Sequence, residues 1–277
     1  MTRDIDRTFF YAAKEAPMYD ETIEWVAPCY RQMHETMLKL AVKNYSESNQ
    51  RAGKGSKRPP IALDMGCGTG AEAVGLLQQI PELRLMGIDL CEPMLHEFAQ
   101  NANRANVDKA RYVLKHLDIL APEATNEIRK AANETFGTEQ FQISISAFTF
   151  HHFDESERKS AFGKIFNLLT AGGIFLLGDL FNYDEESTWL TQTTKNWELD
   201  FITNNFDREI GKDPQAAEGL TKLKNEWVRH YRVENRLSGM QRQMRELRDA
   251  GFVDVGSPFR YWQVGLVFAK KPNPNQR

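Results

Sequence analysis

From residue 61 onward, short apolar runs alternate with longer segments in which apolar residues recur every three or four positions. The apolar runs predict strands at residues 61–65, 85–89, 112–117, 141–147 and 173–179. The segments between them predict helices at residues 71–79, 93–105, 122–136 and 155–169. Because parallel strands need long crossover connections, this alternation predicts an α/β fold with a mostly parallel sheet and helices on both faces.

Two further apolar runs, at residues 252–257 and 261–270, follow Gly251. Only residues 258–260 separate them, which is too short for a crossover helix, so this last pair of strands is predicted to be antiparallel. The expected sheet therefore has seven strands.

Two helical regions lie outside this alternation. Between Tyr19 and Tyr45 the apolar spacing predicts a helical arm with an interruption near Pro28. Residues 1–58 are accordingly assigned to an N-terminal helical arm and linker, and residues 59–277 to the main domain. Within that domain, about residues 184–236 are too long for one connection and are predicted to be a helical cap insertion.

The composition excludes several classes of protein. Among 277 residues, 35 Lys and Arg face 38 Asp and Glu, so the net charge of −3 disfavours nucleic acid or an anionic membrane as the main partner. No apolar run approaches the roughly 20 residues needed to cross a bilayer, and the polar start lacks the core of a signal peptide. The chain is therefore expected to be soluble and cytoplasmic. Three cysteines without a CxxC pair predict neither a disulfide framework nor a metal site.

The segment DMGCGTG, at residues 64–70, joins the first predicted strand to the first helix. Gly66, Gly68 and Gly70 allow a sharp turn and a close approach of the backbone to a ligand. The following helix presents unpaired N–H groups, which suit a carboxylate or phosphate. The segment therefore indicates an anion-bearing ligand, and the alternative is a tight turn that binds nothing.

Three aspartates, Asp64, Asp89 and Asp118, stand at the ends of three consecutive predicted strands. An acidic residue at the end of the second strand, where Asp89 lies, can accept hydrogen bonds from both hydroxyls of a ribose. Taken singly, each aspartate could instead cap a helix or a turn. Together with the glycine segment, they predict a nucleoside-like ligand at this edge.

As an ordered set, these segments resemble the motifs of class I S-adenosylmethionine (SAM)-dependent methyltransferases. The matching segments are DMGCGTG at residues 64–70, GIDLCEPML at 87–95, HLDIL at 116–120 and the strand–helix–strand region at 144–180. Ala171 replaces the proline that is usual before the fifth strand. The resemblance covers about residues 62–271 apart from the cap, and it implies a Rossmann-like fold with SAM as the cofactor.

The resemblance also implies roles for individual residues. The glycine segment would hold the methionine part of SAM, Asp89 the ribose, Asp118 the adenine amino group and Met94 a face of the adenine. The full set of expected cofactor-binding residues is Tyr30, Asp64, Gly66, Cys67, Gly68, Gly70, Asp89, Leu90, Met94, Asp118 and Ile119. Acidic neighbours suit the cationic sulfonium and amino groups, and a helix N-terminus suits the carboxylate.

A dinucleotide is the rival ligand. Residues 66–71 also fit the pattern GxGxxA, with Asp89 as the ribose partner. The third acidic strand end and the antiparallel final pair are not part of that pattern, so SAM is favoured over NAD.

Methyl transfer from a sulfonium needs mainly alignment of the acceptor, with a base only if the acceptor must lose a proton. His151 and His152, after the fourth strand, are the candidate catalytic residues. Since adjacent residues of a strand point to opposite sides, at most one of them is expected to face the pocket, and the alternative is that both belong to the start of the next helix. His34 and His230, in the arm and cap, are further candidates.

The arm and cap are rich in aromatic residues, among them Trp25, Trp197, Phe206 and Trp227. An aromatic lid would bury a small apolar or aromatic acceptor and exclude water. The alternative is that these rings only pack the cap onto the sheet. The arm and cap also carry enough apolar surface to form a homodimer contact.

The favoured hypothesis is therefore a methyltransferase that acts on a small molecule. The layout is also similar to the carboxy-SAM synthase family, in which a tyrosine placed like Tyr30 of the segment APCY touches the cofactor. This chain departs from that family in its glycine segment and has no certain counterpart of the carboxylate-binding arginine. A SAM-binding subunit without activity, and a protein or nucleic-acid acceptor, stay open as alternatives.

Overall fold

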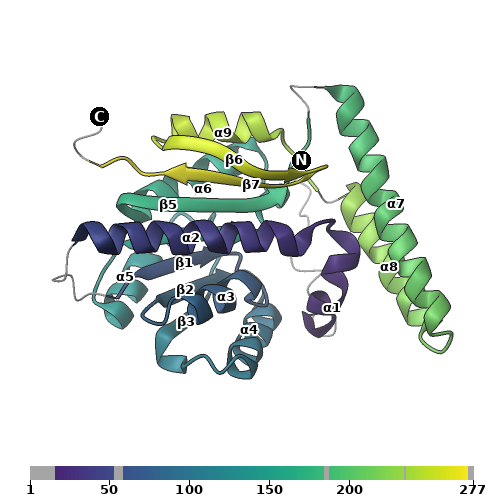
Figure 1. Ribbon diagram of the computed structural model, residues 1–277, viewed down its shortest axis with the longest axis horizontal. Helices are drawn as coiled ribbons and strands as arrows, with labels where there is room; N and C mark the ends of the chain where they lie inside the picture. Colours follow the sequence, from purple (N-terminus) through teal and green to yellow (C-terminus); the bar gives the residue numbers. More distant parts are fainter. Residues whose placement is uncertain (1–15, 53–58, 184–186, 234, 274–277) are drawn as a thin grey trace.

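The computed structural model describes residues 16–52, 59–183, 187–233 and 235–273, and a seven-stranded sheet forms its centre (Figure 1). The strand order is β3-β2-β1-β4-β5-β7-β6. Strands β1 to β5 pair in parallel, whereas β7 is antiparallel to both β5 and β6. The bounds are β1 Ile61–Met65, β2 Arg84–Asp89, β3 Tyr112–His116, β4 Phe141–Ala147, β5 Leu169–Leu180, β6 Val253–Tyr261 and β7 Val264–Lys270. This sheet confirms the predicted fold class.

Helices cover both faces of the sheet, as Figure 1 shows. Helices α2, α3 and α4 lie on one face, and α5, α6 and α9 on the other. The bounds of these helices are α2 Tyr30–Ala52, α3 Ala71–Gln79, α4 Glu92–Arg104, α5 Ala124–Phe136, α6 Glu155–Leu168 and α9 Met240–Asp249. Two short 3₁₀ helices, η3 Lys109–Arg111 and η4 Phe150–His152, precede β3 and follow β4.

The register of the sheet brings the carboxyl ends of the first three strands together. Met65 of β1 pairs with Ile88 of β2, and Asp89 of β2 pairs with His116 of β3. All five residues of β1 are buried, as expected of a strand covered on both faces. The segments that follow β1, β2 and β3 therefore meet at one edge, which is where parallel α/β sheets bind ligands.

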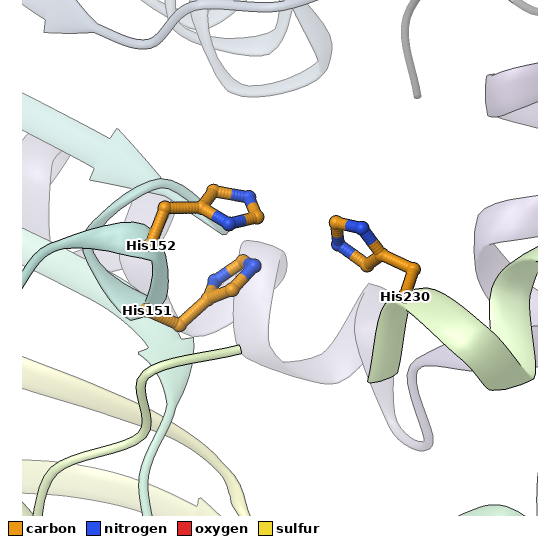
Figure 2. Close-up of side chains that lie close together, drawn as sticks. All are labelled: His151, His152 and His230. Atoms are coloured by element: carbon orange, nitrogen blue, oxygen red, sulfur yellow. The ribbon is translucent and has the colours of Figure 1, made fainter. Parts of the chain in front are cut away.

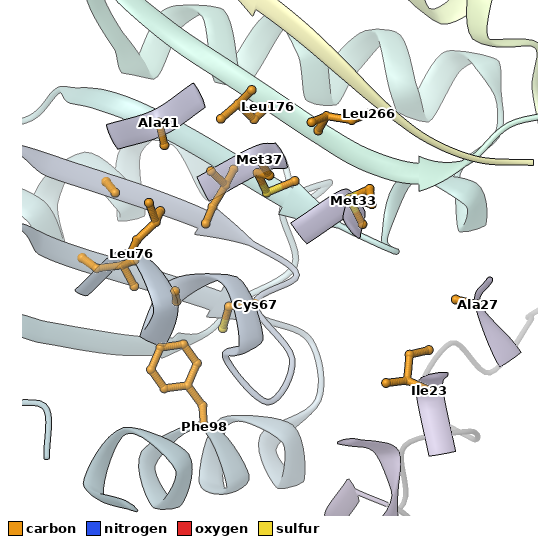
Figure 3. Close-up of a cluster of buried hydrophobic side chains, with 14 of the residues drawn as sticks. Ile23, Ala27, Met33, Met37, Ala41, Cys67, Leu76, Phe98, Leu176 and Leu266 are labelled. Atoms are coloured by element: carbon orange, nitrogen blue, oxygen red, sulfur yellow. The ribbon is translucent and has the colours of Figure 1, made fainter. Parts of the chain in front are cut away.

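The N-terminal arm is part of the helical layer over the sheet. Met33 and Met37 of α2 are fully buried and face Leu176 of β5 and Leu266 of β7 (Figure 3). A side chain at Gly178 of β5 would collide with Met33, so this glycine permits the close approach of α2 to the strand. Helix α2 also continues past Tyr45, where the helical spacing of the arm ends in the sequence, and reaches Ala52. The rest of the expected linker, residues 53–58, lies outside the described residues.

The cap is an antiparallel pair of helices, α7 (Thr188–Lys212) and α8 (Ala217–Val233), beside the end of the sheet (Figure 1). Helix α1 (Ala16–Val26) lies between α7 and the sheet, and Trp25 packs edge-on against Phe206 with ring centroids 5.3 Å apart. Within the described residues, no helix is long and apolar enough to span a membrane.

The turn of the last hairpin differs from the prediction. Strand β6 continues through Pro258 to Tyr261, and the turn falls at Trp262 and Gln263 rather than at residues 258–260. Proline is tolerated here because β6 is the edge strand, and its pairing with β7 is interrupted by irregularities around Gly256.

Candidate functional site

The glycine segment forms a tight turn between β1 and α3. Gly66, Gly68 and Gly70 all adopt positive φ, at 68°, 49° and 86°, which L-residues with a side chain adopt only under strain. The amides of Gly66 and Cys67 donate to the carbonyl of Ile88, at 2.8 and 3.0 Å, and so fix the turn against the end of β2.

The glycines of this turn meet different surroundings. A Cβ at Gly66 would collide with the side chain of Thr149, and one at Gly70 would collide with the ring of Phe98. A Cβ at Gly68 would meet no atom within 4 Å, so its α-carbon faces open space. Gly66 and Gly70 therefore serve packing, whereas Gly68 leaves room for a ligand.

Asp89 joins the glycine turn to the segment after β2. One carboxylate oxygen accepts from the amide of Gly68 and the other from the amide of Cys91, both at 2.8 Å. Burial raises the pKa of Asp89, and these hydrogen bonds together with one from Leu90 oppose that rise. The carboxylate thus holds the open glycine while lying at the edge of the adjoining cavity.

Asp64 lies beneath the turn and is fully buried. Neither of its carboxyl oxygens has a hydrogen-bond partner among the described residues. Burial, followed by the charges of Glu72 and Asp89, raises its pKa well above the ordinary value. A buried carboxyl group without a partner is costly, so this position suits a nearby positive charge.

A cavity, here called the strand-end cavity, opens above these residues. It brings together nine of the eleven expected cofactor-binding residues, namely Tyr30, Gly66, Cys67, Gly68, Asp89, Leu90, Met94, Asp118 and Ile119. Asp64 and Gly70 are not among its lining residues and support the turn from behind. The other residues that line it are Tyr19, Thr69, Ala71, Glu72, Ile88, Cys91, Leu117, Ala147, Phe148, Thr149, His152 and Phe153.

Glu72, which sequence reasoning missed, forms part of the wall of this cavity with the arm. It is buried in the first turn of α3, and His34 of α2 places Nε2 2.8 Å from its Oε1. Burial by itself would raise the pKa of Glu72, but the neighbouring His34 outweighs it and holds that pKa below the ordinary value. The signal that could have identified Glu72 is an acidic residue in the first turn of the helix that follows the glycine segment.

Tyr30 completes that wall. Its ring stacks on Phe148 with centroids 5.6 Å apart and planes 18° apart, and it also contacts His34. Burial, with the charges of Glu72 and other acidic neighbours, raises the pKa of Tyr30 well above the ordinary value. The phenol is therefore a hydrogen-bond donor in the neutral pH range.

Helix α1 closes over the glycine turn through Asp20, a second residue that the sequence did not single out. Its carboxylate accepts from the hydroxyl of Thr69 at 2.5 Å and from the amide of Asn101 at 2.7 Å. Asn101 also donates to the carbonyl of Thr69 at 3.0 Å. These bonds connect α1, the glycine turn and α4, and they place the neighbouring Tyr19 over the cavity.

A second, more apolar cavity lies between α1, β5 and α8 and is here called the cap cavity. It shares Tyr19 and Phe148 with the strand-end cavity. Its other lining residues are Ile23, Val26, Ala27, His151, Leu180, Trp227, His230, Tyr231 and Asn235. The aromatic residues of the arm and cap that line it are therefore Tyr19, Trp227 and Tyr231, whereas Trp189 and Trp197 are exposed.

The histidine pair lies at the junction of the two cavities. β4 ends at Ala147, and the 3₁₀ helix η4 carries both residues, so the alternation of a strand does not govern their directions. His152 lines the strand-end cavity and His151 the cap cavity, where its ring points toward His230 (Figure 2). His151 Nδ1 lies 2.6 Å from Oδ1 of Asp179, a fully buried carboxylate.

The strand-end cavity meets the requirements of a nucleoside that also carries an amino acid. The start of α3 provides N–H groups for a carboxylate, Gly68 leaves space for close approach, and the unpartnered carboxyl of Asp64 suits a cationic group. Asp89 ends β2 and Asp118 follows β3, where sugar and base contacts are made in folds of this kind. The fold and site thus define a Rossmann-like protein that binds an adenosyl cofactor.

Comparisons with known proteins agree with this class. Residues 62–173 match the family model described as "Methyltransferase domain". The carboxy-S-adenosyl-L-methionine synthase of Actinobacillus succinogenes is 23% identical over 261 residues, covering 91% of this chain and 92% of that protein. Residues 62–173, which carry the glycine turn and the ends of β1 to β3, are therefore a methyltransferase domain, and SAM is the cofactor, as the motifs implied, rather than NAD.

Solved structures share the fold at low identity. The CurJ carbon methyltransferase superposes with a TM-score of 0.60 at 14% identity, over 93% of this chain but only 58% of that longer chain. The magnesium protoporphyrin IX methyltransferase of Synechocystis, solved with bound S-adenosylhomocysteine, gives a TM-score of 0.51 at 14% identity, over 87% of this chain and 84% of that one.

Proposed function

We propose that the protein transfers the methyl group of SAM to a small, largely apolar acceptor held in the cap cavity. The observation that carries this proposal is the contact between the two cavities, which share Tyr19 and Phe148. A cofactor in one cavity and an acceptor in the other would face each other across these two rings. When bound, the sulfonium supplies a methyl group attached to a good leaving group.

The proposed cofactor contacts follow from the strand-end cavity. The N–H groups at the start of α3 would bind the carboxylate, Asp89 the ribose hydroxyls, and Asp118 the adenine amino group. Met94, which lines the same cavity, would pack against the adenine, and Tyr30 and Glu72 would form the wall nearest the arm. Asp64 would act from beneath the turn through its charge.

The proposed acceptor site is the cap cavity, which is built from α1, α8 and the end of β5. Its lining combines the aliphatic residues Ile23, Val26 and Leu180 with the ring of Trp227, so it favours an apolar or aromatic molecule. His151 and His152 are the polar groups between the two cavities, and they are proposed to act on the proton of the acceptor.

The proposal can be tested with the purified chain, SAM and a cell extract divided by size. We expect S-adenosylhomocysteine to form when the low-mass fraction is added, together with a low-mass product that carries one additional methyl group. If S-adenosylhomocysteine formed only with the macromolecular fraction, the acceptor would be a protein or a nucleic acid. Saturable SAM binding without turnover in any fraction would indicate a subunit without activity, and both outcomes would contradict the proposal.

Carboxy-SAM synthesis is the second candidate, favoured by the coverage of the Actinobacillus relative and by Tyr30 in the strand-end cavity. Against it, the described residues that line the two cavities include no arginine or lysine to bind a second carboxylate. Mass spectrometry distinguishes the two activities, because carboxy transfer increases the mass of the cofactor itself whereas methyl transfer increases that of an acceptor.

A further inference from the structure

Three histidines from two separate elements converge where the two cavities meet. His151 and His152 belong to η4, and His230 belongs to the last turn of α8 (Figure 2). One ring nitrogen from each lies within 4.8 Å of the other two. The ring centroids of His151 and His152 are 4.0 Å apart, and those of His152 and His230 are 5.2 Å apart.

Asp179 fixes the orientation of one of these rings. Its carboxylate, at 2.6 Å from His151 Nδ1, also accepts from the amides of Phe150 and Leu180 at 2.7 Å each. A carboxylate held in this way accepts the proton of Nδ1, so the lone pair of His151 is on Nε2. A carboxylate behind a histidine is the usual support of a metal ligand, because it fixes the tautomer and raises ligand basicity.

The separation of the rings fits a metal site after a small adjustment. Zinc–nitrogen bonds of about 2.0–2.1 Å in a tetrahedral site place the ligand nitrogens about 3.3 Å from one another. Rotation of the side chains can bring the nitrogens from within 4.8 Å to this spacing. The backbones of the two elements are already held together, since the amide of Arg236, which follows α8, donates to the carbonyl of His151 at 2.6 Å. His151 and His230 are buried, which limits competition from bulk water.

We propose that His151, His152 and His230 bind one divalent transition-metal ion of the zinc class. Three neutral imidazoles suit zinc, cobalt, nickel or copper, and three protein ligands leave a fourth position open. The cysteine spacing, which was the basis for expecting no metal, carries no information about histidines from separate elements.

His151 and His230 line the cap cavity, so a metal bound there would lie beside the proposed acceptor. This inference therefore extends the proposed function and rests on it for the role of the metal. With the metal bound, the three imidazoles are ligands and no longer take up the proton of the acceptor. An acceptor hydroxyl or thiol would take the open position as an anion, and its proton would pass to solvent. Coordination to a divalent cation lowers the pKa of such a group, which makes it a better nucleophile at neutral pH.

The test uses the full chain after treatment with a chelator, titrated with Zn²⁺ alone by calorimetry. We expect one equivalent to bind, and His152→Gln and His230→Gln to weaken binding at least about tenfold, whereas His96→Gln, an exposed histidine of α4, leaves it unchanged. Absence of saturable binding, or equal binding by His230→Gln and His96→Gln, would overturn the site.

Two further measurements separate coordination from a general effect on folding. Asp179→Asn should weaken zinc binding about 10- to 100-fold. The carboxylate of Asp179 accepts from Nδ1 of His151 with one oxygen and from the backbone amide of His151 with the other, whereas an asparagine side chain can accept with only one of these two atoms. With Co²⁺ as the spectroscopic probe, ethanethiol should change the visible spectrum of the wild-type chain by occupying the open position. An unchanged spectrum would overturn the assignment of an open position.

The same samples are assayed for SAM binding, so the two proposals can fail separately. Zinc binding by a chain that does not bind SAM would support the metal site and contradict the proposed function. SAM binding by a chain that does not bind zinc would overturn the metal site alone.

Discussion

The carboxylate of Asp89 accepts a hydrogen bond of 2.8 Å from the backbone amide of Gly68, twenty-one residues earlier in the chain. The bond joins the end of β2 to the one glycine of the turn whose Cβ position is open. A single side chain therefore shapes the glycine turn and lies where the ribose is proposed to bind.

Substitution of Asp89 by alanine is expected to weaken SAM binding about 10- to 100-fold. The change removes the proposed charge-assisted hydrogen bond to the ribose, which contributes about 1.5–3 kcal/mol to binding. Calorimetric titration with SAM measures the effect. Asp108→Ala, an exposed aspartate that accepts from Ala110 far from the cavity, is the matched control. Equal affinities for the two variants would place the cofactor elsewhere.

Alanine at Gly68 is expected to remove SAM affinity with little loss of fold stability. Its φ of 49° costs an L-residue about 1–2 kcal/mol, and the new methyl group points into the proposed ligand space. Gly137→Ala is the matched control, because Gly137 has a φ of 71° and equally open surroundings at the end of α5. Both variants should lose similar stability in denaturant melts, and only Gly68→Ala should lose binding.

Alanine at Gly66 is expected to behave differently from alanine at Gly68. Its Cβ would collide with Thr149, so both stability and SAM affinity should fall. A Gly66→Ala variant that melted like the wild type would contradict close packing of the turn against the segment after β4.

Substitution of Asp20 by alanine is expected to weaken SAM binding about 5- to 150-fold. It removes the two hydrogen bonds that hold α1 over the glycine turn, each contributing about 0.5–1.5 kcal/mol. Glu21→Ala, the next residue of the same helix and exposed, should have no effect. A double-mutant cycle of Asp20→Ala with Thr69→Val should show coupling, and additive effects would contradict closure through this bond.

The stability of the cap is expected to depend on pH through Glu198. This residue of α7 is buried, accepts from the hydroxyl of Tyr231 at 2.5 Å, and accepts from the amide of Gln263 at 2.9 Å. Burial raises its pKa from 4.5 to about 7, against the opposing hydrogen bonds. The folded protein therefore retains a proton that the unfolded chain releases, and the free energy of unfolding should fall as pH rises from about 4.5 to 7.

The titration of Glu198 lowers the free energy of unfolding by at most about 3 kcal/mol. Glu198→Gln mimics the neutral side chain, so its denaturant melts at pH 5 and pH 8 should differ less than those of the wild type. Glu35→Gln, an exposed glutamate of α2, should keep the wild-type difference. If Glu198→Gln also kept that difference, the cap would not be the source of the pH dependence.

Local patterns in the sequence were sufficient for the sheet and for the cofactor class. The alternation of strands and helices, the three glycines, and aspartates at successive strand ends are all readable along the chain, because backbone conformation and burial impose short-range periodicity. The hairpin turn was misplaced for the same reason: Pro258 is a local signal for a turn, and only the position of β6 at the sheet edge makes it acceptable within a strand.

The tertiary structure decided what the sequence could not. Asp20 lies forty-nine residues from Thr69, His151 lies seventy-nine residues from His230, and Glu72 meets His34 of another helix. No periodicity relates such residues, because their proximity depends on how α1, α2 and α8 pack on the sheet. The sequence by itself therefore determined the fold class and the kind of cofactor, whereas packing between distant elements decided the closure of the site, the acceptor cavity and the histidine cluster.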